Sequence, residues 1–277
     1  MRITENRYGK SGVRVARVVR HQDRHEMHEM TVAIQIEGDF DSSYSEGDNS
    51  KVLPTDTMKN TVYAFAAGPE AAQPESFALL LARHFVSTQP QVHRASVEVQ
   101  CQPWQRNGRF SFSGSGPLRR TASVTAEGAS ETVEAGIADY LLLKTTGSAF
   151  AGFVKDSYTT LAETQDRLFA TSLDARWRYR GEDISMDTNW WDTSWHAVMK
   201  LLTETFAEHE SKSVQHTLYA MGEAVLAECD HVSRIHLTMP NKHYLPVDLR
   251  PFGLSNANEV FVPTDEPHGL IEAVLEQ

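Results

Sequence analysis

The sequence predicts an α+β fold built from two similar modules, each with an antiparallel sheet and two helices. Several segments alternate apolar and polar residues, and others carry apolar residues at helical spacing. Both halves repeat the order strand–strand–helix–helix–strand–strand, which indicates a tandem repeat. Strands that flank a pair of helices favour an antiparallel sheet with the helices on one face. We place the modules at residues 8–137 and 138–277.

Alternating residues predict the strands of both modules. In the first module the strands lie at 13–19, 30–36 and 93–101. In the second module they lie at 140–146, 169–179 and 235–239. The region 104–137 is rich in Gly, Ser and Arg and weakly patterned, which indicates a long hairpin. We expect the segment 240–244 to interrupt the last strand pair.

Apolar residues at helical spacing predict two helices in each module. The first helix starts after Pro54, where residues 55–57 are all N-cap types, and the second follows Pro74. In the second module one helix spans about 195–206, and Ser213 caps the other. A helix start carries unpaired backbone N–H groups, so residues 55–57 are a candidate seat for an anion.

Composition limits the possible partners. The net charge is −11, which argues against the basic footprint that nucleic-acid binding needs. No apolar run approaches the roughly 20 residues of a membrane span, and the N-terminus shows no apolar signal segment. Cys101 and Cys229 lie far apart and suit a reducing compartment. We therefore expect a cytoplasmic protein that binds neither nucleic acid nor membrane.

The sequence contains no familiar cofactor motif. His21, His25 and His28 are spaced like metal ligands, but they lie in a highly charged turn without an obvious further ligand, so we expect surface histidines. A Gly-rich phosphate loop and a nucleophile elbow are both missing, and nothing obvious holds a flavin, a nicotinamide or a haem. We expect no metal and no cofactor.

A scattered polar set remains as candidate chemistry. Lys10 follows Gly9, which would give flexible access, and a partly buried lysine can act as a base. Phe150 offers a ring face for stacking, and Arg167 can fork onto a planar anion. Each also has a plainer interpretation: a solvated lysine, a core phenylalanine, and a surface pair of Arg167 with Asp166.

Two further segments offer polar groups. Val214 and Gln215 lie in the first turn of the helix capped by Ser213, where a backbone N–H and a side-chain amide can both face a ligand. Asn241 and His243 place a carboxamide and an imidazole two residues apart.

Taken together, these segments resemble the uricase (urate oxidase) family. Several motifs in the family's order are far more specific than any one of them, and the resemblance spans nearly the whole chain; it is weakest over about residues 102–137. The matching segments are Tyr8-Gly9-Lys10 with Val13-Arg14-Val15, residues 55–61, 144–153 and 158–167, Ser213-Val214-Gln215, and residues 240–244.

The resemblance implies the tandem tunnelling fold (T-fold), in which each half is a four-stranded antiparallel sheet with two helices. In the family, two subunits close a sixteen-stranded barrel and two barrels stack into a homotetramer. Closing a barrel removes the open sheet edges that favour unwanted pairing. The family's sites lie at subunit interfaces, with the Thr-Asp segment supplied by the neighbour.

The resemblance also implies how the substrate is held. Phe150 would stack on the purine ring. Arg167 and Gln215 would grip opposite parts of the ring edge, helped by the backbone N–H of Val214.

The remaining site residues would complete the site and handle protons and oxygen. The backbone of Thr55 and Asp56 would bind the side of the five-membered ring. Lys10, Thr55 and His243 would form a proton relay, and Asn241 would help to hold dioxygen, or later water, above the ring.

The implied activity is oxidation of urate by O₂ and water to 5-hydroxyisourate and hydrogen peroxide, the first step of urate degradation to allantoin, without a cofactor. O₂ chemistry normally needs a metal or organic cofactor. Urate, however, is electron-rich, and losing a further proton lets it reduce O₂ directly while the protein supplies orientation and base catalysis. Two alternatives stay open: a pterin-binding enzyme of the same fold, some of which need zinc, and a non-catalytic purine-binding relative.

Overall fold

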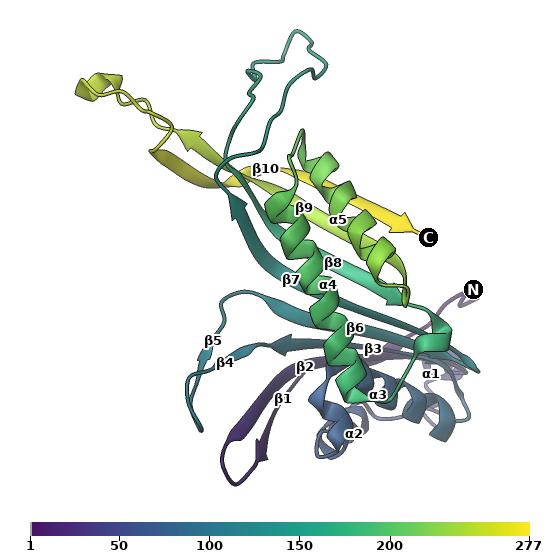
Figure 1. The fold of residues 1–277 in the computed structure, drawn as a ribbon. Coiled ribbons are helices and arrows are strands. Elements are labelled where there is room, and N and C mark those ends of the chain that lie inside the picture. Colours follow the sequence, from purple (N-terminus) through teal and green to yellow (C-terminus); the bar gives the residue numbers. More distant parts are fainter. Residues whose placement is uncertain (1) are drawn as a thin grey trace. The chain divides into compact units, whose positions relative to one another are not determined.

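In the computed structural model, which describes residues 2–277, strands and helices form an α+β fold (Figure 1). The elements are β1 (Tyr8–Arg20), β2 (His25–Gly38), α1 (Asp41–Ser45), α2 (Thr55–Phe65), α3 (Pro74–Thr88), β3 (Val92–Gln102), β4 (Trp104–Arg106), β5 (Phe112–Gly114), β6 (Arg119–Glu127), β7 (Ser130–Lys144), β8 (Phe169–Tyr179), α4 (Thr188–Glu208), α5 (Val214–Glu228), β9 (Val232–Pro246) and β10 (Phe261–Glu276). Short 3-10 turns lie at Pro69–Ala72, Gly181–Asp183 and Arg250–Phe252.

The main sheet has the hydrogen-bonded order β1-β2-β3-β6-β7-β8-β9-β10, and β4 pairs with β5 separately. The pairs β1–β2, β2–β3, β3–β6 and β9–β10 are antiparallel. The predicted α+β class and antiparallel sheet are therefore confirmed. The second half follows the predicted order of two strands, two helices and two strands, whereas the first half adds α1, β4 and β5 to it.

Contacts divide the chain into two compact units. The first comprises Met1–Ile137 with Trp177–His196, and the second comprises Ala138–Arg176 with Ala197–Gln277. Strands β7 and β8 and helix α4 contribute residues to both units. The module boundaries at 8–137 and 138–277 stay a prediction.

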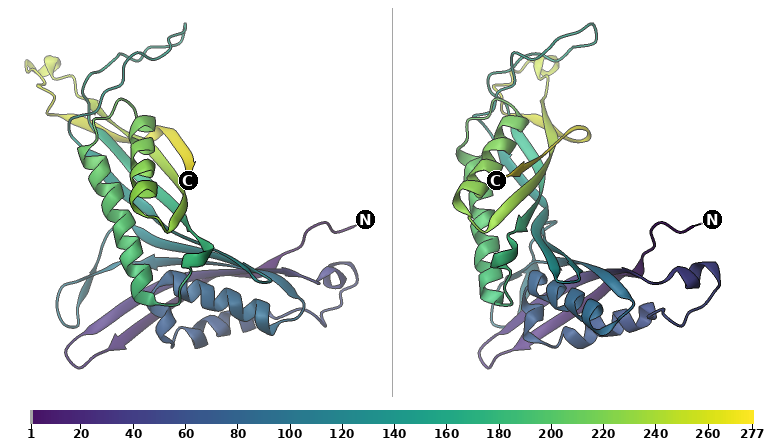
Figure 2. Two further views of the ribbon diagram at one scale, coloured as in Figure 1. Left: turned by 45° about the vertical axis from the view of Figure 1, so that its right-hand side comes forward. Right: turned by 90° about the vertical axis from the view of Figure 1, so that its right-hand side faces the viewer.

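In the first unit, α2 and α3 cover one face of the strands (Figure 2). The inward residues of β2 are at most 2% exposed: Met30, Val32, Ile34 and Ile36. The inward residues of α3 are buried as well: Phe77, Leu81 and Phe85. The alternating apolar residues of β2 and the helically spaced apolar residues of α3 thus belong to one apolar layer.

A buried ion-pair network completes this layer. Arg120 of β6 donates to Glu75 at 3.0 Å and to Asp192 at 2.9 Å, and its guanidinium lies 4.9 Å from the Trp195 ring centroid. Glu75 is fully buried, and burial raises the pKa of its carboxyl group despite the nearby cation. Removing one partner would leave a buried charge uncompensated, which is strongly destabilising.

In the second unit, α5 lies along β9 and β10 in both views of Figure 2. The buried residues of β9 alternate along the strand: Val232, Ile235, Leu237 and Met239. They face the apolar side of α5, which carries Leu218, Met221 and Val225. Gly222 allows close contact with β10, because a Cβ there would lie 2.9 Å from Leu275 Cδ1.

Three local predictions were wrong. The region 104–137 is not one long hairpin, because it contains β4, β5, β6 and the start of β7 at Ser130. The N-cap of α2 is Pro54, without a side-chain cap, rather than one of residues 55–57. The segment 240–244 lies inside continuous β9; the interruption is a register shift in β10 between Thr264 and Gly269.

The cysteines form no disulfide, and the histidines near the first turn contact neighbouring side chains. Both cysteines are free; Cys229 is buried, and burial raises the pKa of the Cys101 thiol to about 12. His21 Nε2 lies 3.1 Å from Glu26 Oε1, and the His25 ring lies 4.7 Å from that of Phe110. Within residues 2–277, no group of three or more His, Cys, Asp and Glu residues is arranged to hold a metal ion. No helix among these residues is long and apolar enough to cross a membrane.

Candidate functional site

Phe150 and Arg167 lie together in the second unit. They belong to the two ends of the connection between β7 and β8, and the Arg167 Cζ atom is 5.5 Å from the Phe150 ring centroid. Phe150 and Thr164 form an antiparallel bridge with N–H···O distances of 2.8 and 3.0 Å. The Phe150 ring also stacks on Phe153, with centroids 4.9 Å apart. The bridge between Phe150 and Thr164 thus places the Phe150 ring beside the Arg167 guanidinium.

The Arg167 side chain is partly buried and still has hydrogen-bonding capacity. Its Nε is buried and has no hydrogen-bond partner within residues 2–277. Burial lowers the pKa of the guanidinium, which nevertheless stays charged because arginine does not deprotonate in proteins. The Asp166 carboxylate accepts hydrogen bonds from Thr146 and Ser148, and within residues 2–277 no side-chain hydrogen bond joins it to this guanidinium. A buried N–H donor without a hydrogen-bond partner favours an incoming acceptor.

Val214 and Gln215 open helix α5, as predicted. The Ser213 Oγ accepts a hydrogen bond from the backbone N–H of His216 at 3.1 Å, which confirms the predicted cap. Val214 is buried, whereas Gln215 is exposed. The segment before the helix is tied to the Phe150 segment, because the Ala149 N–H donates to the Ser211 carbonyl at 2.7 Å.

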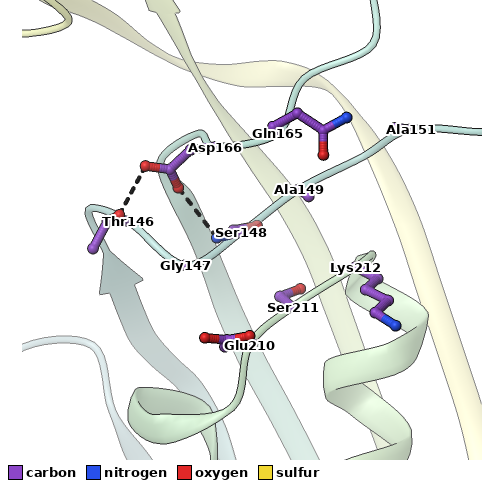
Figure 3. A pocket seen from close by; sticks show the side chains of 10 residues that line it. All are labelled: Thr146, Gly147, Ser148, Ala149, Ala151, Gln165, Asp166, Glu210, Ser211 and Lys212. Atoms are coloured by element: carbon purple, nitrogen blue, oxygen red, sulfur yellow. Dashed lines mark hydrogen bonds between the residues drawn. The ribbon is translucent and has the colours of Figure 1, made fainter.

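A cavity of about 510 Å³ lies beside these segments (Figure 3). Its lining comes from the start of the β7–β8 connection, the residues just before Arg167, and the residues that precede α5: Thr146, Gly147, Ser148, Ala149, Ala151, Gln165, Asp166, Glu210, Ser211 and Lys212. It therefore borders all three segments that carry Phe150, Arg167 and Val214.

Asn241 and His243 lie two residues apart on β9 and therefore on the same face of the strand. His243 pairs with Thr264 and Asn241 pairs with Gly269, so β10 has extra residues opposite the single position of Lys242. The Lys242 ammonium donates to Asp265 in this bulge at 2.7 Å. Within residues 2–277, no hydrogen bond joins Asn241 or His243 to Phe150, Arg167 or Gln215.

The other predicted residues lie in the first unit. Lys10 is in β1, next to a bulge between Lys10 and Val13. Gly9 precedes it for a reason other than flexibility: a Cβ at this position would lie 1.8 Å from the Ile34 carbonyl oxygen. Only glycine permits this approach of β1 to β2, so Gly9 sets the position of Lys10.

Thr55 and Asp56 begin helix α2. The Tyr8 hydroxyl accepts from the Leu53 N–H at 2.8 Å, which ties the residues before the helix to the strand that carries Lys10. The Asp56 carboxylate accepts hydrogen bonds from Lys59 and Asn60.

The hydrogen bonds to Asp56 and the nearby positive charges both affect the pKa of its carboxyl group. The hydrogen bond from Lys59 is the largest cause of a lowered pKa at Asp56, and the charge of Lys10 contributes in the same direction. The side chain of Asp56 is thus occupied within its own helix. What the helix start offers to a ligand is its backbone N–H groups.

The comparisons with known proteins decide the family. The sequence profile described as uricase matches residues 6–127 and 133–272. The chain belongs to the uricase family. It is 41% identical to the uricase of Arthrobacter globiformis over 275 residues, which cover 99% of this chain and 89% of that protein. It is also 41% identical to the uricase of Arabidopsis thaliana over 292 residues, covering 98% of this chain and 94% of that protein.

Solved uricase structures agree with the fold. The crystal structure of the Arthrobacter globiformis uricase superimposes with a TM-score of 0.94 at 40% identity, covering 100% of this chain and 95% of the other. The uricase of Bacillus fastidious gives a TM-score of 0.81 at 23% identity, covering 98% of this chain and 93% of that one, and this likeness bears on the fold alone. The resemblance to the uricase family inferred from the sequence motifs is therefore confirmed.

Proposed function

We propose that the protein is a urate oxidase that converts urate, O₂ and water to 5-hydroxyisourate and hydrogen peroxide without a cofactor. Family membership over nearly the whole chain supports this activity. The structural observation that carries it is the Arg167 guanidinium, partly buried and 5.5 Å from the Phe150 ring centroid. Urate is flat and anionic, so an aromatic face beside a cation suits it.

Substrate binding uses groups of the second unit. Phe150 stacks on the purine ring; in the structure its ring also stacks on that of Phe153, with the centroids 4.9 Å apart. Arg167 and Gln215 grip the two ends of the ring edge, and the backbone N–H of Val214 adds a donor at the start of α5. These contacts supply positive charge locally in a chain of net charge −11.

Proton transfer and oxygen binding use the remaining predicted residues. The backbone at Thr55 and Asp56 binds the side of the five-membered ring. Lys10, Thr55 and His243 relay a proton from the substrate, which raises its electron density until it reduces O₂ in a two-electron step. Asn241 holds the oxygen and then the water that adds to the oxidised ring.

The assembly completes the site. We propose a tandem T-fold with modules at 8–137 and 138–277, a sixteen-stranded barrel from two subunits, and a homotetramer of two barrels. Thr55 and Asp56 then reach the site from a neighbouring subunit. We also propose a cytoplasmic location, which the two free cysteines support and cell fractionation would test.

The test follows urate absorbance, O₂ uptake and hydrogen peroxide together in metal-free buffer. We expect equal amounts of urate and O₂ consumed and peroxide formed by protein that was dialysed extensively against a chelator. Stoichiometric zinc together with binding of a pterin would favour the pterin-binding alternative. Tight urate binding without O₂ uptake would identify the non-catalytic purine-binding relative.

A further inference from the structure

Asp166 joins the two segments that carry Phe150 and Arg167. Its Oδ2 accepts a hydrogen bond from Thr146 Oγ1 at 2.7 Å, and its Oδ1 accepts one from the Ser148 backbone N–H at 3.3 Å (Figure 3). The bond from Thr146 is the largest cause of a lowered pKa at this carboxyl group, and backbone N–H groups add to it. The carboxylate is therefore ionised and bonded to the opposite segment at neutral pH.

The carboxylate takes the place of a missing backbone link. Phe150 and Thr164 exchange two backbone hydrogen bonds as an antiparallel pair. Two residues along each segment, Ser148 would lie opposite Asp166, and a continued ladder would pair their main chains. Instead the Thr164 hydroxyl donates to the Asp166 carbonyl at 2.8 Å, and the Ser148 N–H turns to the Asp166 carboxylate. The main chain can then leave the ladder at Asp166.

Arg167 depends on this link for its position. It directly follows Asp166, and its guanidinium stands 5.5 Å from the Phe150 ring centroid. Its Nε is buried without a partner within residues 2–277, so no hydrogen bond at that atom aims the side chain before a ligand binds. The position of the side chain then depends on its contact with the Phe150 ring and on the backbone that enters Arg167.

The same link extends to helix α5. The Ser211 N–H donates to the Gly147 carbonyl at 2.9 Å, and the Ala149 N–H donates to the Ser211 carbonyl at 2.7 Å. Ser211 Oγ in turn donates to the carbonyl of Ser213, the cap of α5, at 3.0 Å. The segment bonded by Asp166 is thus sandwiched between the segment of Arg167 and the start of the helix that bears Val214.

We propose that Asp166 is a positioning residue for urate binding. Its carboxylate fixes Arg167 against Phe150 and, through residues 147–149, fixes the start of α5. In this proposal Asp166 acts through Arg167 and residues 147–149, and the inference rests on the proposed function. A residue that only stabilises its loop would change the stability of the protein and leave KM in place.

The experiment compares Asp166→Ala with a matched control in the same connection. Asp156 accepts hydrogen bonds from the Tyr158 N–H and the Thr159 hydroxyl, both at 2.9 Å, so it also bonds a backbone N–H and a threonine hydroxyl. Within residues 2–277, the hydrogen bonds of its carboxylate stay in its own turn. Losing charge-assisted hydrogen bonds that hold the clamp should raise KM for urate about 10- to 100-fold in Asp166→Ala, with kcat within about threefold of wild type. Asp156→Ala should leave both constants unchanged.

Two milder variants keep the test decisive if Asp166→Ala does not fold. Thr146→Val removes the hydroxyl that donates to Asp166, and Asp166→Asn keeps one side-chain oxygen as an acceptor. Each variant should raise KM less than Asp166→Ala does and leave kcat unchanged. Unchanged KM in the folded variants, or an equal rise in Asp156→Ala, overturns the proposal.

A separate measurement distinguishes failure of the proposed function from failure of the positioning role. The wild-type protein must oxidise urate in the same assay, and if it does not, the activity itself is refuted. Calorimetric binding of xanthine, a flat purine, then still reports on the clamp. Equal xanthine affinity in wild type and Asp166→Ala would overturn the positioning role under either outcome.

Discussion

Replacing Arg167 by methionine should weaken urate binding and stabilise the free protein. A buried donor without a partner costs about 1–3 kcal/mol, and the lower end applies here because the side chain is only partly buried. Methionine keeps much of the volume and removes that cost. We therefore expect the free energy of unfolding to rise by about 1 kcal/mol, or the melting temperature by about 2–4 °C. The lost forked contact should raise KM by about 100-fold or more.

The assay is thermal unfolding of the ligand-free protein at one fixed protomer concentration, together with KM for urate. Arg83→Met is the matched control, because Arg83 donates to Glu131 at 2.5 and 2.7 Å. That variant loses a satisfied pair and should unfold about 0.2–1 kcal/mol more easily with normal KM. If Arg167→Met is destabilised like Arg83→Met and still binds urate normally, Arg167 is not a preformed cation that holds an unsatisfied Nε ready for urate.

Three further outcomes follow from the structure. Lys10→Met and Thr55→Ala should lower kcat about 10²- to 10⁴-fold with KM little changed, as measured by O₂ uptake; near-normal turnover in both would remove them from the relay. Gly9→Ala places a Cβ 1.8 Å from the Ile34 carbonyl oxygen, so urea unfolding should show a loss of about 1–3 kcal/mol, and an unchanged midpoint would contradict the close approach. The lowered pKa of Asp166 means that its stabilisation is complete above about pH 4 and lost as the pH falls through the pKa of the folded state. Urea unfolding of wild type and Asp166→Asn should therefore differ constantly from neutral pH to about pH 4 and converge below it; a difference that grows in acid would contradict this sign.

Strong periodicity made most of the fold predictable from sequence. The alternating apolar residues of β2, β8 and β9 and the helical stripes of α3 and α5 all coincide with buried faces. Strand β6 was missed because its inward positions carry little apolar signal. They are occupied by Arg120, Ala122, Val124 and Ala126, and the arginine is accommodated by a buried ion pair that no periodicity reveals.

The structure tests where the predicted site residues lie, and their roles stay predictions. The predicted cap at Ser213 is confirmed, and Arg167 lies beside Phe150, as the family resemblance implies. Asp166 was expected at most as a surface partner of Arg167, whereas the structure bonds it to Thr146 and Ser148. The Asp166 carboxylate can replace a backbone link only because these two segments pair in the folded protein. Sequence spacing does not reveal which segments pair.

The two cysteines make the protein a convenient scaffold for chemical labelling. Burial raises the pKa of both thiols, that of Cys101 to about 12, so near neutral pH both form the thiolate that alkylating reagents attack less readily than an exposed cysteine does. A cysteine introduced at Val154, which is 93% exposed, would then react faster than either of them with a maleimide fluorophore. The connection that carries Phe150 could thereby be tagged in the wild-type background, without first removing the native sulfurs.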